Sequence, residues 1–372
     1  MARLSALCVA LCVASAAAFA PSARLARSAR RRAPRSALSM STCLIVQNKG
    51  GGHGEIGFHL AKRLAAGGHD VTMLHEGAAK AGVNPFAEYG TLTDAGVDIV
   101  WADPSDGTAA LPAGATYDVV FDNWSKDAGK AQPFVALAKA SKSAHYVFVS
   151  SGGMYTPPAD YAFPMDEACP TKATGQRAVE ELLAAEGLPW TAFRPQYIYG
   201  PLTNKRGYID WYLDRCARGR ALPIPEDGSQ KVTLTHADDV AAMLEAVVGN
   251  AGAVGQVFNC ATDDALGYDD VARMCADALG SGEPNIVHFD PNDFDKTAFP
   301  FRATNFYVSP SKAKEVLGWK PAHSLGEDIG WYTKQYVDGK MGDADFSDAA
   351  HNDDKVLVAF DPVLVDDGEF TV

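Results

Sequence analysis

A glycine-rich segment between an apolar strand and an amphipathic helix constrains the fold of this chain more than any other feature. The segment QNKGGGHGEIGFHL follows the apolar residues 43–46 and leads into a helical pattern over 56–66. Its glycines Gly51, Gly54 and Gly57 recur every third residue. Small residues at this spacing let the backbone turn sharply and approach a pyrophosphate, while the helix start supplies free N–H groups and a positive dipole end. The segment therefore predicts a nucleotide-binding βα unit.

Strands and helices continue to alternate up to about residue 200. Further strands are predicted at 70–74, 97–101, 118–121, 145–150 and 190–194, and helices at 133–140 and 175–185. Such alternation is typical of βαβ units, which assemble into a parallel sheet. We therefore expect an α/β fold with a Rossmann-like, doubly wound parallel sheet over residues 41–200.

After Pro195 the pattern loosens and predicts a smaller C-terminal α/β subdomain of the substrate-binding type. We expect it to cover residues 201–340 and to be interleaved with the sheet. Helices are predicted at 207–218, 237–248, 269–279 and 309–317, and strands at 232–235 and 256–260, with His236 in the cap region of the second helix. Residues 341–372 are acidic and only partly patterned, so they are predicted to form a tail.

The first 40 residues differ in composition from the rest of the chain. They contain seven arginines and no acidic residue, and the first acid of the chain is Glu55. An apolar run over 4–20 is typical of a secretory signal, and the Arg-, Ser- and Ala-rich stretch 22–39 is typical of a transit peptide. Together they predict a signal plus transit peptide that directs the chain to the stroma of a plastid bounded by extra membranes. The alternative is a plain secretory signal followed by a basic pro-segment.

Charge and cysteine content limit the classes of function. The chain has 33 basic and 46 acidic residues, so removing the seven leader arginines leaves 26 against 46, a net charge of about −20. This balance counts against indiscriminate polyanion binding, because nucleic-acid binders usually carry a basic footprint. The five cysteines beyond the leader are scattered, without a Cys-x-x-Cys pair, and indicate neither a disulfide framework nor a zinc site. No other segment is long and apolar enough to predict membrane insertion of the mature chain.

The glycine loop predicts NAD(P) as the cofactor. The residues expected to contact it are those of the loop, the helix start and the end of the second strand: Gly51, Gly54, Glu55, Ile56, Gly57 and Glu76. An acidic side chain at the end of the second strand suits the ribose hydroxyls, although Glu76 stands one place later than usual. The alternative is a loop that survives as scaffold, with a vestigial cofactor site.

The residues that carry out hydride transfer in short-chain reductases are incomplete here. Those enzymes use a tyrosine as general acid/base and a lysine four residues later, which lowers the pKa of the phenol. Alignment on the helix 175–185 places Ala173 at the tyrosine position and Arg177 at the lysine position. Ser151 stands where such enzymes hold a substrate-binding serine, but without the proton donor a strand-end cap is the simpler interpretation. Classical reductase or epimerase activity is therefore not expected.

The chain resembles, along residues 43–338, the chloroplast stem-loop-binding proteins, which are atypical, epimerase-like members of the extended short-chain dehydrogenase superfamily. The resemblance rests on QNKGGGHGEIGFHLAKRL, YDVVFDN, VFVSSGGMY, TAFRPQYIYGP, LPIP, THADDVAAML, QVFNCA, IVHFDP, AFPFR and EVLGWKP. It implies RNA as the partner, with stem-loop transcripts or ribosomal RNA as targets. It also implies self-association and, in some members, a divalent-metal-dependent endoribonuclease activity.

If RNA binds, the basic residues around the predicted helix 207–218 are the candidates for phosphate contact: Lys205, Arg206, Arg215 and Arg218. Tyr208, Trp211 and Tyr212 lie between them and are expected either to stack on unpaired bases or to belong to the core. Arg215 is also a candidate to pair with Asp210 or Asp214.

For Mg²⁺, the candidates are acids expected near the carboxyl edge of the sheet: Asp118, Asp122 and Asp127. His53 is a candidate acid/base for phosphodiester cleavage. Two alternatives to an RNA-processing protein stay open: an NAD(P)-dependent nucleotide-sugar epimerase or dehydratase, and a non-catalytic structural partner of a plastid complex.

Overall fold

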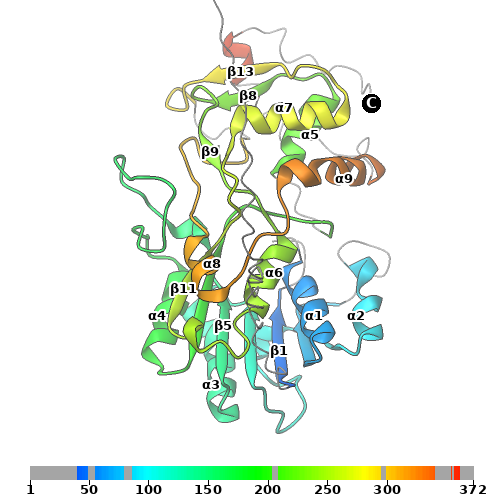
Figure 1. Cartoon of the computed structure of the whole chain (residues 1–372), viewed down its shortest axis with the longest axis vertical. Helices are drawn as coiled ribbons and strands as arrows, with labels where there is room; N and C mark the ends of the chain where they lie inside the picture. Colours follow the sequence, from blue (N-terminus) through cyan, green and yellow to red (C-terminus); the bar gives the residue numbers. More distant parts are fainter. Residues whose placement is uncertain are drawn as a thin grey trace, which may run out of the picture. The chain divides into compact units, whose positions relative to one another are not determined.

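The computed structural model describes residues 40–48, 55–78, 86–202, 208–294, 299–339, 353 and 356–360. Seven strands form a parallel sheet in the order β11-β6-β5-β4-β1-β2-β3 (Figure 1). The strands are β1 (Thr42–Gln47), β2 (Asp70–His75), β3 (Asp98–Trp101), β4 (Val119–Asn123), β5 (His145–Val149), β6 (Trp190–Pro195) and β11 (Gln256–Cys260). The predicted doubly wound sheet is confirmed, and the strand order reverses between β1 and β4. In such sheets a ligand binds at this reversal, outside the carboxyl ends of the strands.

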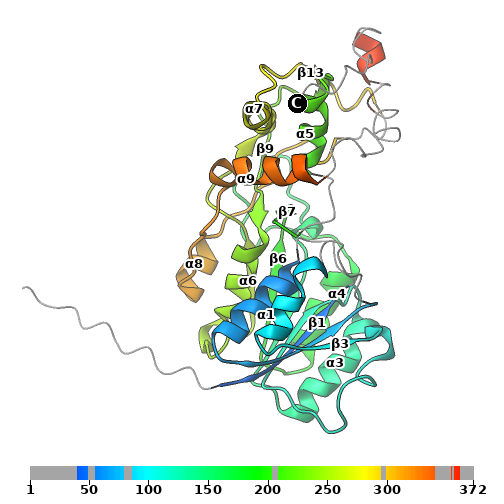
Figure 2. The ribbon, with the colours of Figure 1, turned by 90° about the vertical axis from the view of Figure 1, so that its right-hand side faces the viewer.

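Side chains that alternate along each strand face two helical layers. Cys43 and Ile45 of β1 belong to a core shared with α1 (Ile56–Ala66), α2 (Gly90–Asp94) and α6 (Ala237–Glu245). Leu44 and Val46 belong to a second core shared with α3 (Ala128–Ser141) and α4 (Gly175–Ala185). Figure 2 shows α1 and α6 on one side of the strands and α3 on the other. Because both faces are covered, the central residues of most strands are apolar and buried.

The C-terminal part is built from α5 (Ile209–Ala217), α7 (Tyr268–Leu279) and α9 (Leu325–Asp338), which share a separate core with β8. Three two-stranded sheets join it: β7 (Ile198–Tyr199) with β10 (Thr235–His236), β8 (Leu222–Pro225) with β13 (Ile286–Phe289), and β9 (Lys231–Val232) with β12 (Leu266–Gly267). Between these elements α6, β11 and α8 (Ser311–Leu317) return to the large sheet. The subdomain limits at residues 200 and 340 stay a prediction.

Several details differ from the sequence-based expectations. The strand expected at 232–235 is two strands, β9 and β10, which pair with different partners on either side of Thr233 and Leu234. The pair β8 and β13 was not predicted, because Pro223 and Pro225 weaken the strand signal of LPIP. The helix α9 was also missed. The remaining short elements are 3-10 turns at Phe86–Glu88, Pro104–Asp106, Gly152–Met154 and Ala251–Ala253.

The structure describes little of the predicted leader and of the predicted acidic tail. The leader, 1–39, lies outside the described residues, and of the predicted tail only 353 and 356–360 are described, with 356–360 helical. Within the described ranges no helix combines the length and apolar composition needed to cross a bilayer.

The start of α4 lies very close to the loop that follows β4. A Cβ on Gly175 would lie 1.9 Å from the carbonyl oxygen of Lys126, so only glycine fits there without a backbone shift. By contrast, Gly330 lies inside α9, and a Cβ added to it would have no other atom within 4 Å.

We therefore expect Gly175→Ala to destabilise the protein by about 1–3 kcal/mol through overpacking. The matched change Gly330→Ala is expected to stabilise it by about 0.5–1 kcal/mol, because alanine favours a helix interior over glycine. Urea unfolding of both variants measures the difference. Equal effects of the two changes would contradict the close approach of α4 to this loop.

Candidate nucleotide cleft and the network beside it

The start of α1 has the close packing that a dinucleotide-binding βα unit requires. Gly51, His53 and Gly54 lie outside the described residues, whereas Glu55, Ile56 and Gly57 are described. A Cβ on Gly57 would lie 1.8 Å from Oε1 of Gln47, the last residue of β1. The third glycine of such loops allows this approach of helix to strand. Gln47 accepts a hydrogen bond in turn from the Asn123 side-chain amide at 2.9 Å, so the carboxyl ends of β1 and β4 are joined.

Glu55, just before α1, lies in a buried polar and aromatic cluster. Its backbone has a φ of 58°, and its carboxylate accepts a hydrogen bond from the Tyr89 hydroxyl at 2.9 Å. The same hydroxyl lies 3.1 Å from Nε2 of His75, the last residue of β2. Burial lowers the pKa of His75 to about 4, so this ring is neutral at pH 7. Glu55 thus contributes its side chain to a buried network with Tyr89 and His75.

Glu76 lies at the carboxyl end of β2, which is the location that contact with a ribose requires. The residue is half-buried, and its carboxylate accepts a hydrogen bond from the indole N–H of Trp124 at 3.1 Å. Because Trp124 follows β4, this bond places Glu76 along the carboxyl edge of the sheet. Glu76 therefore lies at the end of the strand where dinucleotide-binding Rossmann folds hold an acid.

The positions of the missing acid/base pair are occupied by residues with other contacts. Ala173 is exposed, and Arg177 is paired with Glu180 at 3.2 Å and Glu181 at 3.0 Å. Ser151 caps the 3-10 turn that follows β5, where its hydroxyl accepts a hydrogen bond from the Gly153 N–H at 3.1 Å. The serine is therefore used as a strand-end cap, as the missing proton donor suggested.

Neighbouring phenols do not replace the missing tyrosine. The Tyr155 hydroxyl is buried, donates to Asn259 at 2.6 Å and accepts from Arg194 at 3.1 Å, and burial raises its pKa. Burial likewise raises the pKa of Tyr161 and of Tyr197 to about 12. A general acid/base needs a pKa near the working pH, so all three phenols are shifted in the unsuitable direction.

The three acids proposed for Mg²⁺ do not come together. Asp118 precedes β4 at its amino end and accepts from the Thr42 N–H at 2.8 Å, which corrects its expected place at the carboxyl edge. Asp122 is fully buried, accepts from the Tyr146 hydroxyl at 2.8 Å, and has a pKa raised by burial. Asp127 caps α3 through the Lys130 N–H at 3.0 Å. Each carboxylate has a structural partner, so these residues do not form a magnesium site.

Of the basic residues proposed for RNA contact, the two that the structure describes are not fully exposed. Lys205 and Arg206 lie outside the described residues. Arg215 is fully buried and pairs with Asp353 of the tail, with an Nε–Oδ2 distance of 2.7 Å, rather than with Asp210 or Asp214. Arg218 donates to the Asp214 carbonyl at 3.1 Å. Trp211 and Tyr212 are buried in the core with α7, so the core alternative for these aromatics is confirmed.

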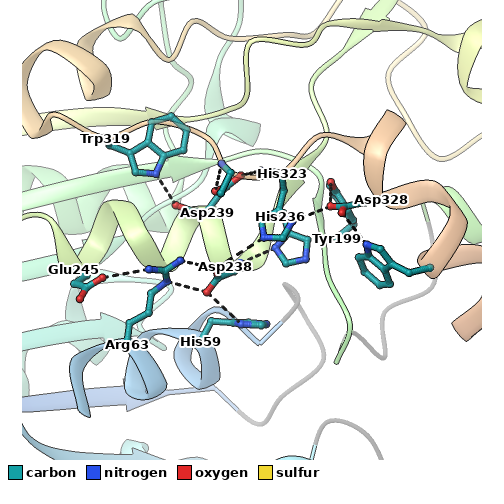
Figure 3. A network of polar contacts seen from close by, with 12 residues as sticks. His59, Arg63, Tyr199, His236, Asp238, Asp239, Glu245, Trp319, His323 and Asp328 are labelled. Carbon is teal, nitrogen blue, oxygen red and sulfur yellow. Dashed lines mark hydrogen bonds and ion pairs between the residues drawn. The ribbon is translucent and has the colours of Figure 1, made fainter. Parts of the chain in front are cut away.

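A polar network at the start of α6 was missed as a site (Figure 3). His236 caps the helix, with its Nδ1 accepting from the Asp238 N–H at 3.1 Å. Asp238 accepts from Arg63 of α1 at 2.8 Å, and Asp239 accepts from the backbone N–H groups of Ala322 and His323 at 2.8 and 3.1 Å. The segment THADDVAAML contains the residues of this network. Its two acids were not predicted as a site, because acids are common in the first turn of any helix.

The network has the residue types of a metal site without the geometry of one. Ligand atoms of His236, His323 and Asp328 lie within 4.8 Å of one another. The two imidazole rings, however, stack at 3.8 Å with planes 16° apart, so their in-plane lone pairs run parallel and do not converge. His236 Nδ1 already accepts a hydrogen bond from a backbone N–H, so the ring proton lies on Nε2. A metal-bound histidine instead binds the metal through one nitrogen and donates a hydrogen bond from the other. We interpret the cluster as a hydrogen-bonded link between α6 and α9.

Asp328 completes this link from the side of α9. It accepts from the Tyr199 hydroxyl and the Trp331 indole, each at 2.8 Å, and lies 3.1 Å from Nδ1 of His323. A pocket of about 580 Å³ opens beside the network, lined by His59, Lys62, Arg63, Ala66, Pro201, His236, Asp238, His323 and Trp331.

Comparison with known proteins agrees with this geometry. Residues 50–261 match the model of the NAD dependent epimerase/dehydratase family, and the chain belongs to this family. Solved structures share the fold. A dTDP-glucose 4,6-dehydratase from Bacillus anthracis in complex with NAD aligns with a TM-score of 0.64 at 16% identity, covering 81% of this chain and 98% of that one. A UDP-glucose 4-epimerase from Thermotoga maritima with UDP-glucose aligns with a TM-score of 0.61 at 18% identity, covering 80% and 99%.

Within this family the sequence points to one group. The chain is 34% identical over 289 residues to the chloroplast stem-loop binding protein of 41 kDa b from Arabidopsis thaliana, covering 75% of this chain and 76% of the relative. It is 28% identical over 310 residues to a UDP-glucose 4-epimerase from Mycolicibacterium smegmatis, covering 75% and 94%. The predicted membership of the stem-loop-binding group is thereby confirmed.

The Asp238 carboxylate gives the network a testable pH dependence. Burial alone would raise its pKa, but hydrogen bonds from His59 and Arg63 outweigh burial and lower the pKa below the ordinary carboxylate value. A depressed pKa in the folded state stabilises the protein above about pH 4 and loses that contribution as the pH falls further.

We expect Asp238→Asn to cost about 1–2 kcal/mol of unfolding free energy at pH 7, because it removes the charge that pairs with Arg63. The difference between parent and variant should shrink as the pH falls from 5 to 3. Urea unfolding at a series of pH values measures it. A difference that stays constant over this range would contradict the assigned ion pair.

Proposed function

We propose that this chain is a plastid RNA-binding protein that recognises structured RNA and retains an NAD(P)-binding cleft without hydride-transfer chemistry. The observation that carries the proposal is the 34% identity, over three quarters of the chain, to a chloroplast stem-loop binding protein. The leader composition, with seven arginines and no acids in 40 residues, supports import into a plastid.

The state of the acid/base positions supports the absence of epimerase activity. Epimerases and dehydratases of this fold need a phenol held near neutrality by a fixed positive charge. Here the phenol position is Ala173, and the cation at Arg177 is shared between two carboxylates. At these two positions, a sugar nucleotide would meet no tyrosine–lysine pair able to remove its proton in the usual way.

Several contacts support a retained cofactor site. The Gly57–Gln47 approach has the tight packing of a dinucleotide-binding unit, and Glu76 lies at the rim where a ribose would be held. NAD is bound in solved structures of the same fold. When bound, NAD(P) would supply its nicotinamide ring for hydride exchange, but the residues of this chain are arranged to hold the nucleotide rather than to move a proton. Binding without turnover suits a sensing or structural role of the cofactor.

Endoribonuclease activity and self-association rest on the resemblance to the stem-loop-binding family. The acids proposed for Mg²⁺ each have structural partners, so metal-dependent cleavage needs ligands other than Asp118, Asp122 and Asp127. The experiment below includes Mg²⁺ so that cleavage is detected if it occurs.

The test is fluorescence anisotropy of a labelled plastid stem-loop RNA with residues 41–372, titrated with salt, with and without Mg²⁺. Each phosphate contact contributes a slope of roughly 0.7–0.9 in log Kd against log salt. We expect saturable binding whose Kd rises at least about tenfold between 50 and 200 mM salt, corresponding to two or more contacts. An unstructured RNA of the same composition is the control. If the stem-loop RNA does not bind at 50 mM salt, the proposed RNA-binding function is wrong.

The absence of sugar chemistry has its own test. With NAD and UDP-glucose, we expect no interconversion of sugars by chromatography, and we expect Ser151→Ala to leave RNA binding unchanged because Ser151 acts as a backbone cap. NAD binding itself is measured by calorimetry. Turnover that is lost in Ser151→Ala would instead establish the alternative, an epimerase with a displaced proton donor.

A further inference from the structure

The guanidinium of Arg215 lies in a site of the kind that binds an oxyanion. It is stacked on the Trp211 indole, 3.9 Å from the ring centroid, and its Nη1 donates to the Trp211 carbonyl at 2.8 Å. Its Nε and Nη2 groups both donate to one carboxylate oxygen of Asp353. Aromatic stacking holds the guanidinium plane in place, and two donors then point at a single acceptor, which suits a phosphate oxygen as well as a carboxylate oxygen.

The carboxylate in this site comes from the distant end of the chain. Asp353 is 138 residues away from Arg215 in sequence and is fully buried. Val356 and Leu357, in the helical turn that follows it, are fully buried as well, whereas Val358 and Phe360 are half exposed. Burial of two apolar side chains therefore accompanies the ion pair in this part of the tail.

The composition of the tail resembles that of a polyanion. Residues 341–372 contain nine acidic residues and one lysine. The stretch leading into α5 has the opposite character, with Lys205 and Arg206 close to Arg215, Arg218 and Arg220 in sequence. In space, Arg215 is influenced by Asp214 and Arg220 in addition to Asp353. The carboxylate of Asp353 occupies the position on Arg215 that a nucleic-acid phosphate would take.

We propose that the Arg215–Trp211 site is an RNA phosphate site, and that Asp353 of the chain's own tail occupies it in competition with RNA. This inference rests on the proposed RNA-binding function and deepens it. It explains how a chain with a net charge of about −20 beyond its leader keeps Arg215 for RNA: a carboxylate of the acidic tail covers this arginine and is displaced by a stronger polyanion.

The test compares full-length mature chains that differ at one residue. Asp353→Asn removes the negative charge that pairs with Arg215 and leaves the size of the side chain almost unchanged. We expect it to lower the Kd for stem-loop RNA at least about threefold at 50 mM salt. We also expect the slope of log Kd against log salt to increase by the amount that roughly one further phosphate contact contributes. The matched control is Asp338→Asn, which removes the same charge from an exposed residue of α9 and should change the affinity far less.

A second variant separates tail release from a change in net charge. Leu357→Asp disrupts this burial of apolar side chains in the tail while adding a negative charge. Release of the tail predicts tighter RNA binding, whereas a net-charge effect predicts weaker binding. Amide exchange at 356–360 should rise in both tail variants, and Arg215→Gln added to Asp353→Asn should abolish the gain in affinity.

The outcomes distinguish this inference from the proposed function. Faster exchange at 356–360 with RNA affinity unchanged from the parent would overturn the inference and leave RNA binding in place. If neither parent nor variants bind RNA, both proposals fall. Tighter binding by Asp353→Asn and Leu357→Asp, but not by Asp338→Asn, would support the competition.

Discussion

The paired carboxylates at the start of α6 hold the two parts of the fold together. Asp238 bonds to Arg63 of α1, and Asp239 accepts two backbone N–H groups from the segment that enters α9. Two consecutive residues of α6 thus connect α1, which follows β1, with the segment that leads into α9. Acids in the first turn of a helix also favour its dipole, so one short motif both starts α6 and sets the place of α9. The stacked rings of His236 and His323 reinforce this link. Burial lowers the pKa of His236 to about 3, so this ring is uncharged at pH 7 and can pack face to face with its neighbour.

The large sheet could be predicted from sequence because its signals are local. Apolar strands, the glycine loop and helical periodicity each lie within about ten residues, and α1, α4 and β11 were predicted with the bounds that the structure has. The parts that were missed depend on partners far along the chain. The strand β8 contains two prolines and is stable only because β13 pairs with it, and Arg215 is buried only because Asp353 returns to it from the tail. From the sequence, Arg215 was predicted to be exposed and Asp118 to lie at the carboxyl edge of the sheet. Neither prediction was correct, because the residues next to them in sequence do not reveal their partners, Asp353 and Thr42.

The chemistry of the chain follows from what the epimerase scaffold keeps and what it lacks. The βα unit keeps the close Gly57–Gln47 packing and an acid at the rim of the cleft. The proton-transfer pair is replaced by Ala173 and by an arginine held between two glutamates. The membership of this chain in the family of stem-loop binding proteins supports our proposal that RNA, rather than a sugar nucleotide, is its ligand. On this account α5 carries a cation that the acidic tail shields.

The most direct test of this account is amide hydrogen exchange of the mature chain with and without a stem-loop RNA. Because exchange reports each segment separately, it shows both whether RNA binds and where. We predict slower exchange along 208–220 on addition of RNA, together with faster exchange at 356–360 as the tail is displaced. Slower exchange confined to the cleft around 55–57 and 76, or no change anywhere at low salt, would contradict the account and return attention to nucleotide-sugar chemistry.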